Sequence, residues 1–438
     1  MKANTALFFV VTLLPAIFIS SLDVVPVIAP KTITVPDDYG TIQMAVEKAN
    51  PGDTVYVRKG LYDATLSSIN SMYIVIDKPL KLIGEDREDT IIKGFQKDQD
   101  NIPVIDVKAN DVTISGFTLT GGVFCIRADP IPFNCRIVGN ILTNSTEDAI
   151  RAHGGISDLT FSITLANLLI SDNIISDNQG RAMYLDCAGV TITDNIISNN
   201  GHRDYPYPLD AIGLDGAYNV TIANNTISNN GKSGLHLGWY GSYQVYGNTI
   251  TGNGAAGIEF YSYCCNTTVY ANNIEKNGIG IQLSEVAEGY RGYGNLVWNN
   301  NIRDNQKQAA TASLTDSVRW DYNNRGNFWS DYKGKGDTPY VIDSNNTDNY
   351  PLTSQITSFM APPPTPLPSS VATPSPQPKF PIQAPTNQSP NMSELVVLVI
   401  LVIVAVILSA NIILFVKRKK AKKQLLAYVY PNSAFKSS

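Results

Sequence analysis

Charged residues are scarce in this chain of 438 residues, of which Asp, Glu, Lys and Arg together make up only 16%. Seven of the basic residues lie between Lys417 and Ser438, where no acidic residue occurs, so subtracting this +7 from the overall −5 leaves −12 elsewhere. A nucleic-acid backbone requires a basic face on the protein that binds it. The shortage of basic residues outside the tail therefore argues against nucleic acid as a partner.

Histidine and cysteine are also rare, with three and five residues respectively. Copper sites favour clusters of His, Met or Cys, so copper is a less favoured ligand than calcium, which carboxylates can bind. Five cysteines in an exported chain allow two disulfides and one free thiol. Cys125 and Cys135, ten residues apart, are the favoured pair, because Cys187 lies several repeats from the adjacent Cys264 and Cys265.

Two long apolar segments lie near the ends of the chain. Residues 1–22 contain Lys2, an apolar run and then small residues, the order of a secretory signal, with an uncleaved N-terminal anchor as the alternative. Residues 395–416 carry no charge and are long enough to cross a membrane as a helix. The basic tail, residues 417–438, follows at once. We therefore predict a single-pass type I protein of the cell membrane, with its bulk extracytoplasmic and a short cytoplasmic tail.

The exported part carries two further signs of its location. Residues 361–392 are rich in proline and polar residues, which predicts an extended stalk between the folded part and the membrane. N-glycosylation sequons suit an exported surface. The candidate glycosylation sites are Asn144, Asn219, Asn224, Asn266, Asn345, Asn387 and Asn391.

A short motif recurs along the middle of the chain, at a shortest spacing of 22 or 23 residues. This period suits one coil of three short strands in a parallel β-helix. A leucine-rich repeat has a similar length, but it requires Leu at fixed positions and a helical segment, whereas these copies alternate Ile or Val with polar residues. We therefore predict an all-β, right-handed parallel β-helix. The copies are Val112–Phe117, Ile137–Asn140, Ile170–Asn173, Ile192–Asn195, Ile222–Asn225, Val245–Asn248, Val269–Asn273 and Val297–Asn301.

Asparagine ends most copies, and a second Asn follows in each repeat. Asparagine tolerates the left-handed backbone of a sharp corner, and its amide can bond the amide of the next coil, ~4.8 Å away. We therefore expect asparagine ladders at two corners of the coil. The second corner is expected at Asn144, Asn178, Asn200, Asn230, Asn253, Asn277 and Asn305.

A third strand is predicted after the second corner, where two apolar residues flank one residue that points outward. Insertions at residues 154–168 and 201–208 lie beside this face, and insertions in solenoids become loops on one side, so we expect a groove. Aligning the repeats stacks the outward residues Arg127, Arg151, Tyr184, Gly213, His236, Glu259 and Gln282 in one column. Two positions further on, a second column contains Asp129, His153, Asp186, Asp215, Gly238, Tyr261 and Ser284.

The beginning and end of the predicted β-helix resemble known families. Residues 32–49, 51–62 and 78–85 resemble the start of pectin-lyase-fold proteins, in which a short helix caps the first coil. Its buried stripe would be Ile42, Ala45, Val46 and Ala49. Residues 326–332 and 336–352 are similar to the closing segment of NosD-like β-helix proteins, which are described as periplasmic copper-binding.

The resemblance implies the fold and defines the expected divisions of the chain. Residues 31–110 would form the N-terminal cap and first coils, 111–310 the Asn-rich coils, and 311–353 the NosD-like closing segment. Residues 332–336 replace an acidic, calcium-like stretch of the family, so the resemblance implies no metal site there. The catalytic segment of the related pectin methylesterases is missing, so esterase activity is not implied.

The outward columns suggest carbohydrate binding or polysaccharide processing. Whether the protein is an enzyme stays open, and a hydrolase, a lyase or an epimerase would each suit the residues. The alternatives are a non-catalytic surface or adhesion protein, and NosD-like binding of calcium or, less favoured, copper. Candidate acid, base or nucleophilic residues are Asp186, Asp215, His236 and Glu259. Candidate residues to hold a uronate or stack on sugar rings are Arg127, Arg151, His153, Tyr184, His202, Trp239 and Tyr261.

Overall fold

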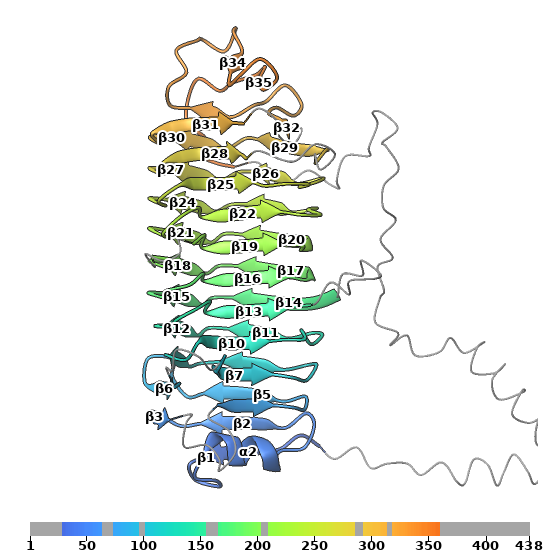
Figure 1. The fold of residues 1–438 in the computed structure, drawn as a ribbon, viewed down its shortest axis with the longest axis vertical. Helices are drawn as coiled ribbons and strands as arrows, with labels where there is room; N and C mark the ends of the chain where they lie inside the picture. The colour runs from blue at the N-terminus through green and yellow to red at the C-terminus, as the bar shows by residue number, and fades with distance from the viewer. Residues whose placement is uncertain are drawn as a thin grey trace, which may run out of the picture. The chain divides into compact units, whose positions relative to one another are not determined.

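The computed structural model describes residues 29–63, 73–95, 101–154, 165–202, 209–284, 292–312 and 318–359. In this part of the chain the fold is a right-handed parallel β-helix built on three long sheets, as predicted. Figure 1 shows its coils stacked one on another, from the N-terminal coils at one end to the closing segment at the other. Each complete coil contributes one strand to each sheet.

The 12-stranded sheet contains β1 (Thr32–Val35), β2 (Thr54–Val57), β5 (Lys81–Gly84), β8 (Thr113–Ser115), β11 (Arg136–Val138), β14 (Leu165–Ser171), β17 (Ala188–Thr193), β20 (Tyr218–Ala223), β23 (Gln244–Tyr246), β26 (Thr268–Tyr270), β29 (Asn295–Trp298) and β32 (Val318–Arg319). The 11-stranded sheet contains β3 (Gly60–Asp63), β6 (Thr90–Lys93), β9 (Thr118–Thr120), β12 (Ile141–Thr143), β15 (Ile174–Ser176), β18 (Ile196–Ser198), β21 (Thr226–Ser228), β24 (Thr249–Thr251), β27 (Asn273–Glu275), β30 (Asn301–Arg303) and β33 (Phe328–Trp329). The 10-stranded sheet contains β4 (Ile74–Ile76), β7 (Pro103–Val107), β10 (Phe124–Ala128), β13 (Ile150–His153), β16 (Met183–Asp186), β19 (Ile212–Asp215), β22 (Leu235–Gly238), β25 (Ala256–Phe260), β28 (Ile279–Leu283) and β31 (Lys307–Thr311).

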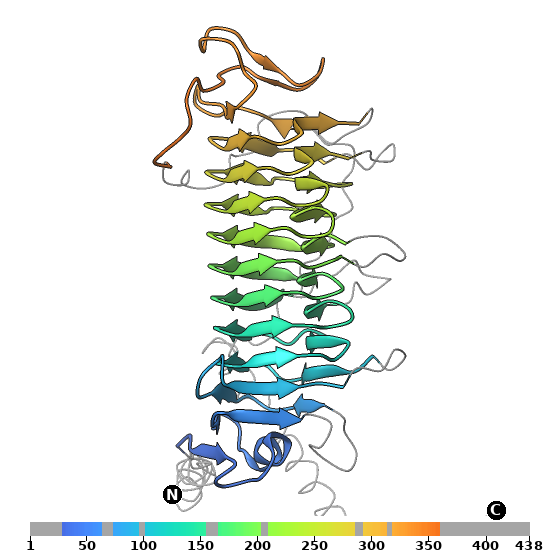
Figure 2. The ribbon, with the colours of Figure 1, turned by 90° about the vertical axis from the view of Figure 1, so that its left-hand side faces the viewer.

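The alternation of apolar and polar residues fixes the register of the coils. In a strand, successive side chains point to opposite faces, so one apolar residue between two polar ones places a single side chain in the interior. Ile137 of β11 pairs with Ile114 below and Ile170 above, and all three side chains are buried. Figure 2 shows the same in-register stacking from the side. The interior is therefore a set of aliphatic columns parallel to the helix axis.

The first asparagine ladder lies at the corner between the 12-stranded and 11-stranded sheets. Asn225 Nδ2 donates to Asn248 Oδ1 at 3.0 Å. Asn225 Oδ1 in turn accepts from Asn195 Nδ2 at 2.9 Å. These amides are buried, so the ladder satisfies groups that would otherwise be costly in the interior. Its members are Asn140, Asn173, Asn195, Asn225, Asn248, Asn272, Asn300 and Asn327.

The second ladder lies at the next corner, before the 10-stranded sheet, and it corrects one predicted position. Asn144 does not belong to it: this residue has a positive φ of 58°, and Ser145 takes the ladder position. The Ser145 hydroxyl donates to Asn178 Oδ1 at 2.7 Å, so a hydroxyl replaces the amide at the start of the stack. From there the ladder continues through Asn178, Asn200, Asn230, Asn253, Asn277 and Asn305.

The two ends of the described β-helix are covered by non-repeating structure. At the N-terminal end, α2 (Ile42–Lys48) begins at the N-cap Thr41, whose hydroxyl accepts from Met44 N at 3.2 Å. Figure 1 shows α2 beside the first strands, and its Ile42, Ala45 and Val46 are buried there, as expected. At the other end, the antiparallel pair β34 (Tyr340–Val341) and β35 (Thr347–Asp348) belongs to the closing segment.

All five cysteines are buried free thiols, so the predicted Cys125–Cys135 disulfide is absent. Cys125 lies within β10 of the 10-stranded sheet, whereas Cys135 lies directly before β11 of the 12-stranded sheet. Cys125 Sγ donates to Leu119 O at 3.5 Å, beside the 11-stranded sheet, whereas Cys135 Sγ donates to Ala109 O at 3.6 Å, before the 12-stranded sheet. Burial raises the pKa of Cys125 to about 12 and that of Cys135 to about 11.

Several sequence predictions concern residues outside the described ranges. These are the signal segment 1–22, the stalk 361–392, the membrane span 395–416, the tail 417–438 and the candidate glycosylation sites Asn387 and Asn391. No helix in the described part of the chain is long and apolar enough to span a bilayer. The membrane anchor therefore stays a prediction.

Candidate functional site

The outward column predicted from the repeats lies on the 10-stranded sheet in the expected order. The second column follows on the same strands, where His153 pairs with Asp186 and Asp215 with Gly238. The sequence spacing therefore predicted correctly which side chains are neighbours along this face. Strand pairing runs through the first column from Arg127 to Arg151, Tyr184, Gly213, His236, Glu259 and Gln282.

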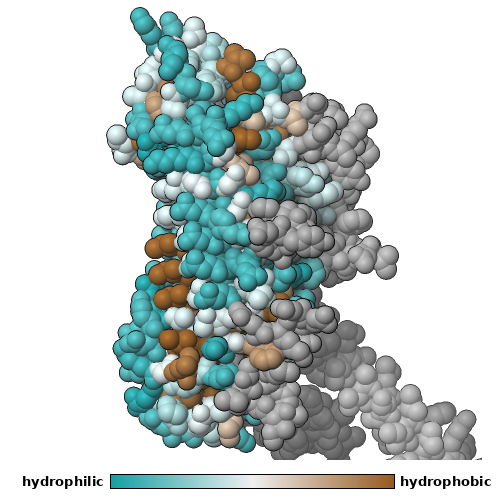
Figure 3. Space-filling model, turned by 60° about the vertical axis from the view of Figure 1, so that its left-hand side comes forward, coloured by the Kyte–Doolittle hydropathy of each residue, from teal (hydrophilic) through white to brown (hydrophobic). Residues whose placement is uncertain are grey.

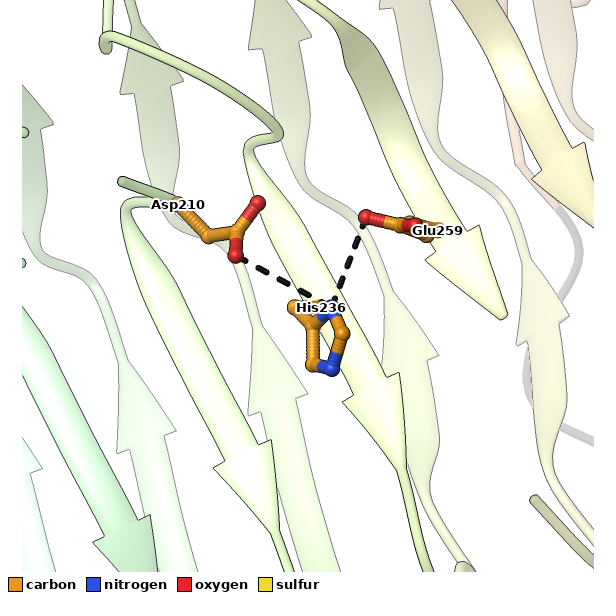
Figure 4. Close-up of side chains that lie close together, drawn as sticks. All are labelled: Asp210, His236 and Glu259. Atoms are coloured by element: carbon orange, nitrogen blue, oxygen red, sulfur yellow. Dashed lines mark hydrogen bonds and ion pairs between the residues drawn. The ribbon is translucent and has the colours of Figure 1, made fainter. Parts of the chain in front are cut away.

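His236 of β22 is the centre of a charged network formed by three coils. Its Nε2 lies 3.2 Å from Asp215 Oδ1, and its Nδ1 lies 3.4 Å from Glu259 Oε2 and 3.8 Å from Asp210 Oδ2. Figure 4 shows Asp210, from the segment before β19, and Glu259, from β25, approaching the ring from either side. Because parallel strands are ~4.8 Å apart, residues in register on adjacent coils can make these contacts directly.

Lys232 and two serines complete the network. Lys232 Nζ lies 3.3 Å from Asp210 Oδ1 and 3.3 Å from Glu259 Oε2, so its ammonium group bridges the two carboxylates. Ser284 Oγ donates to Glu259 Oε1 at 2.6 Å, and Ser233 Oγ donates to Glu259 Oε2 at 3.2 Å. Both oxygens of Glu259 are therefore engaged within the protein.

These contacts determine the protonation states. Burial alone would lower the pKa of His236, but hydrogen bonds to Asp215 and Glu259 outweigh it and raise this pKa to about 9. Burial would raise the pKa of Glu259, but hydrogen bonds from His236 and Ser284 lower it to about 2. The pKa of Asp215 is lowered, because its hydrogen bond with His236 outweighs burial. Burial would lower the pKa of Lys232, but the charges of Asp210 and Glu259 outweigh burial and raise it.

At neutral pH His236 and Lys232 are therefore cations, and Asp215 and Glu259 are ionised carboxylates. Protonated His236 can donate a hydrogen bond or a proton. Neither His236 nor Lys232 is a neutral base at this pH, and Glu259 is ionised, so it cannot serve as the protonated carboxyl of a two-carboxylate hydrolase. The arrangement is better suited to binding polar groups than to abstracting a proton.

A second charged cluster lies two coils away, around Tyr184. Arg151 Nη1 lies 3.8 Å from Asp148 Oδ2, and Arg181 Nη1 lies 4.0 Å from Asp148 Oδ1. The guanidinium carbons of Arg151 and Arg181 lie 5.4 Å and 4.9 Å from the centre of the Tyr184 ring, within the range of a cation–π contact. Burial raises the pKa of Asp148, and the charges of Arg181 and Arg151 lower it only in part.

The other charged residues of the face are more tightly paired. Arg127 donates through Nη2 to Asp106 Oδ2 at 2.6 Å and through Nη1 to Asn101 O at 2.7 Å. His153 Nδ1 is in contact with Asp186 Oδ2, and Asp186 Oδ1 also accepts from Gly154 N at 2.6 Å. Burial raises the pKa of Asp186. Arg127 and Asp186 thus have structural partners.

Three further candidates from the sequence lie in different settings. Tyr261 is 38% exposed, and its ring centre lies 4.9 Å from that of His236, so it borders the network. His202 contacts Asn229 O through Nε2 at 2.7 Å, beside the second ladder and away from His236. Trp239 has an unusual φ of 36°, and its backbone N donates to Ser262 O at 3.0 Å. Tyr261 alone of these three is in contact with His236.

The sequence predictions missed four charged residues of this face: Asp148, Arg181, Asp210 and Lys232. Three of them share one position in the repeat, two residues before the first inward residue of the strand. Asp148 Oδ1 accepts from Arg181 N at 3.0 Å, and Asp210 Oδ1 accepts from Ser233 N at 3.1 Å, which is the same contact two coils later. Aligning the residues before each strand, as well as those within it, would have found this column.

The groove expected from the insertions is not established, because residues 155–164 and 203–208 lie outside the described ranges. A hollow of about 790 Å³ lies elsewhere, beside the 11-stranded sheet and the second corner, and is lined by Asp63, Lys93, Gln179 and their neighbours. None of the candidate catalytic or substrate-binding residues lines it. Figure 3 shows that hydrophilic side chains dominate the surface that is visible in that view.

The fold and this face define a class of protein, a parallel β-helix with a charged, in-register column on one sheet. Within that class, the chain belongs to the NosD family: the family model described as "Periplasmic copper-binding protein (NosD)" matches residues 49–334. No curated protein matches the chain.

Solved structures share the β-helix fold at low sequence identity. A pectate lyase is 14% identical, with a TM-score of 0.47 over 69% of this chain and 78% of that one. An alginate lyase from Paenibacillus is 12% identical, with a TM-score of 0.45 over 66% of this chain and 99% of that one. The A-module of a mannuronan C-5 epimerase from Azotobacter vinelandii is 13% identical, with a TM-score of 0.39 over 63% of this chain and 85% of that one.

The copper in the family's description does not suit the donor atoms found on this face. Asp210, His236 and Glu259 form the one group of three potential metal ligands found in the described part of the chain, with donor atoms within 4.8 Å of one another. Copper favours additional His, Met or Cys ligands, whereas this group supplies one imidazole and two carboxylates. Lys232 also lies against both carboxylates, where it would repel a cation.

Proposed function

We propose that this protein binds a glycan along the outward face of the 10-stranded sheet, between β13 and β28. The proposal rests mainly on one observation, an in-register column on six successive coils, formed by Arg151, Tyr184, Gly213, His236, Glu259 and Gln282. A linear polymer that runs parallel to the helix axis would meet one outward side chain about every 4.8 Å. A polymer of repeating sugar units could therefore make similar contacts on successive coils.

The chemistry of the face supports a hydrated, polar ligand. Sugar hydroxyls both donate and accept hydrogen bonds. The partly exposed Arg151 guanidinium group supplies a donor, and the partly exposed, ionised carboxylate of Asp215, held by His236 at 3.2 Å, supplies an acceptor. The exposed ring of Tyr261 adds an apolar surface next to His236, on which a sugar ring can pack. Donor, acceptor and aromatic surface are the contacts that carbohydrate recognition requires.

We propose binding rather than catalysis as the primary function, because the lowered pKa values of Asp215 and Glu259 make these carboxylates weak bases. If the protein has enzymatic activity, His236 is the side chain best placed to act as a proton donor. A lyase or an epimerase would also need a base, and the described part of this network offers only carboxylates for that role. A non-catalytic surface or adhesion protein is consistent with this arrangement.

The proposal includes a location outside the cytoplasm. The family description names a periplasmic protein, and the sequence predicts an export signal at residues 1–22 and a membrane span at 395–416. Glycan recognition at the cell surface is a function for which such an anchor would be useful.

Glycan-array binding of the full-length protein tests the proposal. The test variant is Asp215→Asn with Glu259→Gln, which removes two charges from the face with little change in shape. The matched control is Asp172→Asn with Asp194→Asn, because both aspartates are exposed, have a positive φ that Asn tolerates, and lie at the first corner. We expect the test variant to lose array binding and the control to keep it. Binding that survives in the test variant would refute the assignment of this face.

A second candidate function, divalent cation binding, rests on the cluster of Asp210, His236 and Glu259. The donor set suits zinc or manganese better than copper. It suits calcium poorly, because calcium takes six to eight oxygen ligands and this group includes an imidazole and only two carboxylates. Metal analysis of the purified full-length protein decides the matter. One equivalent of a bound metal that is lost in the Glu259→Gln variant would favour this function, and its absence from both proteins would remove it.

A further inference from the structure

Arg151 and Arg181 carry positive charge that the described side chains around them neutralise only in part. Both guanidinium groups share one carboxylate, that of the buried Asp148, at 3.8 Å and 4.0 Å. Neither distance is a hydrogen bond, for which the donor and acceptor should lie within about 3.2 Å. In the described part of the chain, Asp148 is the one carboxylate within 4.0 Å of either guanidinium group. The charge of Asp215 also acts on Arg181, but from further away. Neither guanidinium group therefore has a carboxylate at hydrogen-bond distance.

The neighbouring Arg127 shows what a structurally satisfied arginine looks like on this face. It makes hydrogen bonds of 3.2 Å and 2.6 Å to Asp106 and one of 2.7 Å to Asn101 O, and only 15% of its side chain is exposed. Arg151, one coil further on, makes no side-chain hydrogen bond within the described residues, and 38% of its side chain is exposed. The donors of Arg151 are therefore available to a ligand.

The Arg181 side chain is partly buried, and its surroundings fix its position. Its Nε is buried without a hydrogen-bond partner in the described part of the chain, and 22% of its side chain remains exposed. It lies over Gly213, where an added Cβ would come within 3.0 Å of Nε and 3.1 Å of Cδ. Contacts this short are rare for a real Cβ. The glycine in the outward column therefore leaves the space that Arg181 occupies.

Tyr184 separates the two guanidinium groups along the face. Tyr184 pairs with Arg151 on one side and with Gly213, beneath Arg181, on the other. Arg151 therefore contacts the ring from the preceding coil, whereas Arg181 belongs to the coil of Tyr184 itself and lies over Gly213 of the next coil. In this arrangement the ring of Tyr184 helps to position both arginines.

We propose that Arg151 and Arg181 bind the carboxylates of a uronic-acid-containing glycan, a proposal that rests on the glycan-binding function above. A guanidinium group presents planar, paired N–H donors that match the two oxygens of a carboxylate, and it stays charged at all physiological pH values. Arg151, Tyr184, Gly213 and His236 occupy four successive coils. A glycan along the helix axis would thus place an acidic unit at the arginines and a neighbouring unit at His236.

A comparison of three polymers isolates the contribution of the carboxylate to binding. They are a polyuronate in its free acid form, the same polymer as its methyl ester, and a sulfated neutral polysaccharide. Binding of each to the full-length protein is measured by calorimetry at low ionic strength, because screening by salt weakens exposed ionic contacts. We expect the free acid to bind at least about tenfold more tightly than the ester, since only the ionised carboxylate can form charge-assisted hydrogen bonds with the two guanidinium groups.

Two variants and one control locate the effect. Arg151→Gln combined with Arg181→Gln should reduce the affinity for the free acid to that for the ester. Gly213→Ala should weaken free-acid binding without any change in charge, because the new methyl group displaces Arg181. Arg136→Gln is the matched control, since Arg136 is an exposed, outward arginine on the 12-stranded sheet of the coil next to that of Arg151. It should leave all three affinities unchanged, and thermal denaturation of each variant verifies the fold.

The outcomes distinguish this inference from the proposed function. Equal affinity for acid and ester, with both weakened by His236→Gln, would overturn the arginine subsite and leave glycan binding intact. Failure of every glycan on the array and in calorimetry would overturn the proposed function itself. Tighter binding of the sulfated polymer than of the polyuronate, lost in the double arginine variant, would overturn the assignment to carboxylate. Loss of free-acid binding in Arg136→Gln would overturn the assignment to this face.

Discussion

The protonation of His236 gives the most quantitative prediction. Its side chain is almost fully buried between Asp215 and Glu259, which raise its pKa from 6.5 to about 9. A pKa that is higher in the folded than in the unfolded protein stabilises the fold when the group is protonated. The stabilisation is fully present below about pH 6.5, decreases between pH 6.5 and about 9, and is lost above that. At 1.36 kcal/mol per pH unit, it amounts to about 3 kcal/mol.

The variant His236→Gln removes this pH-dependent contribution and keeps a polar side chain of similar size. The free energy of unfolding is measured by urea denaturation of wild type and variant at several pH values. We expect the wild-type advantage to be larger at pH 6 than at pH 9.5 by about 3 kcal/mol. His202→Gln is the matched control, because His202 contacts a backbone carbonyl at the second ladder and lies outside the network.

A direct titration tests the same reasoning without unfolding. The chain contains three histidines, so NMR of protein labelled with ¹³C at histidine gives three imidazole signals. The signal that disappears in His236→Gln belongs to His236, and we expect it to titrate near pH 9. A midpoint near 6.5, or a wild-type advantage that does not change between pH 6 and 9.5, would refute the assigned network.

Three further predictions concern the ladder, the cysteines and the lysine. Asn225→Ala removes hydrogen bonds to Ile192 O, Ala223 O and Asn248 and leaves buried groups unpaired, so we expect a loss of about 3 kcal/mol or more in stability, and an unchanged melting temperature would contradict the ladder's role. A thiol reagent should label none of the five buried cysteines in the native protein and all five in denaturant without reductant, whereas labelling of three or fewer in denaturant would indicate a disulfide. Lys232→Ala should increase the affinity for Zn²⁺ or Mn²⁺ at least about tenfold in calorimetry, because the ammonium group no longer repels the ion, and an unchanged affinity would show that Lys232 does not occupy the site.

The register of the coils was predictable from sequence because the side-chain period of a strand is two and the asparagine corners mark the phase. A shift by one residue would turn Ile150 outward and Arg151 inward, so one arrangement is strongly preferred. This is why Arg151, Tyr184, His236 and Glu259 could be aligned correctly. The sequence assigned the first position of the second ladder to Asn144, but Ser145 occupies it, because a hydroxyl can replace an amide at the end of a ladder.

The partners of those side chains were harder to predict. Asp148, Arg181 and Asp210 precede the strands, where the alternation of apolar and polar residues has not yet begun, so their direction is fixed by the corner and not by the strand period. The spacing of Cys125 and Cys135 suggested a disulfide, but the corner between them places Cys125 in β10 and Cys135 before β11, where the thiols contact different carbonyl groups. Side-chain positions were predicted correctly within the strands, where the repeat determines their direction, and incorrectly near the corners of the coil.

The central claim is that the glycan lies on the 10-stranded sheet, and labelling of one face at a time tests it most directly. Because the native cysteines are buried, a single introduced cysteine can be labelled selectively with a fluorophore. The variants are Gln282→Cys on the 10-stranded sheet, Gln244→Cys on the 12-stranded sheet and Ser198→Cys on the 11-stranded sheet, all at outward positions. We expect a glycan that binds on the array to change the fluorescence at residue 282 and to leave the other two labels unaffected. A change confined to residue 244 or residue 198 would place the ligand on another sheet and contradict the claim.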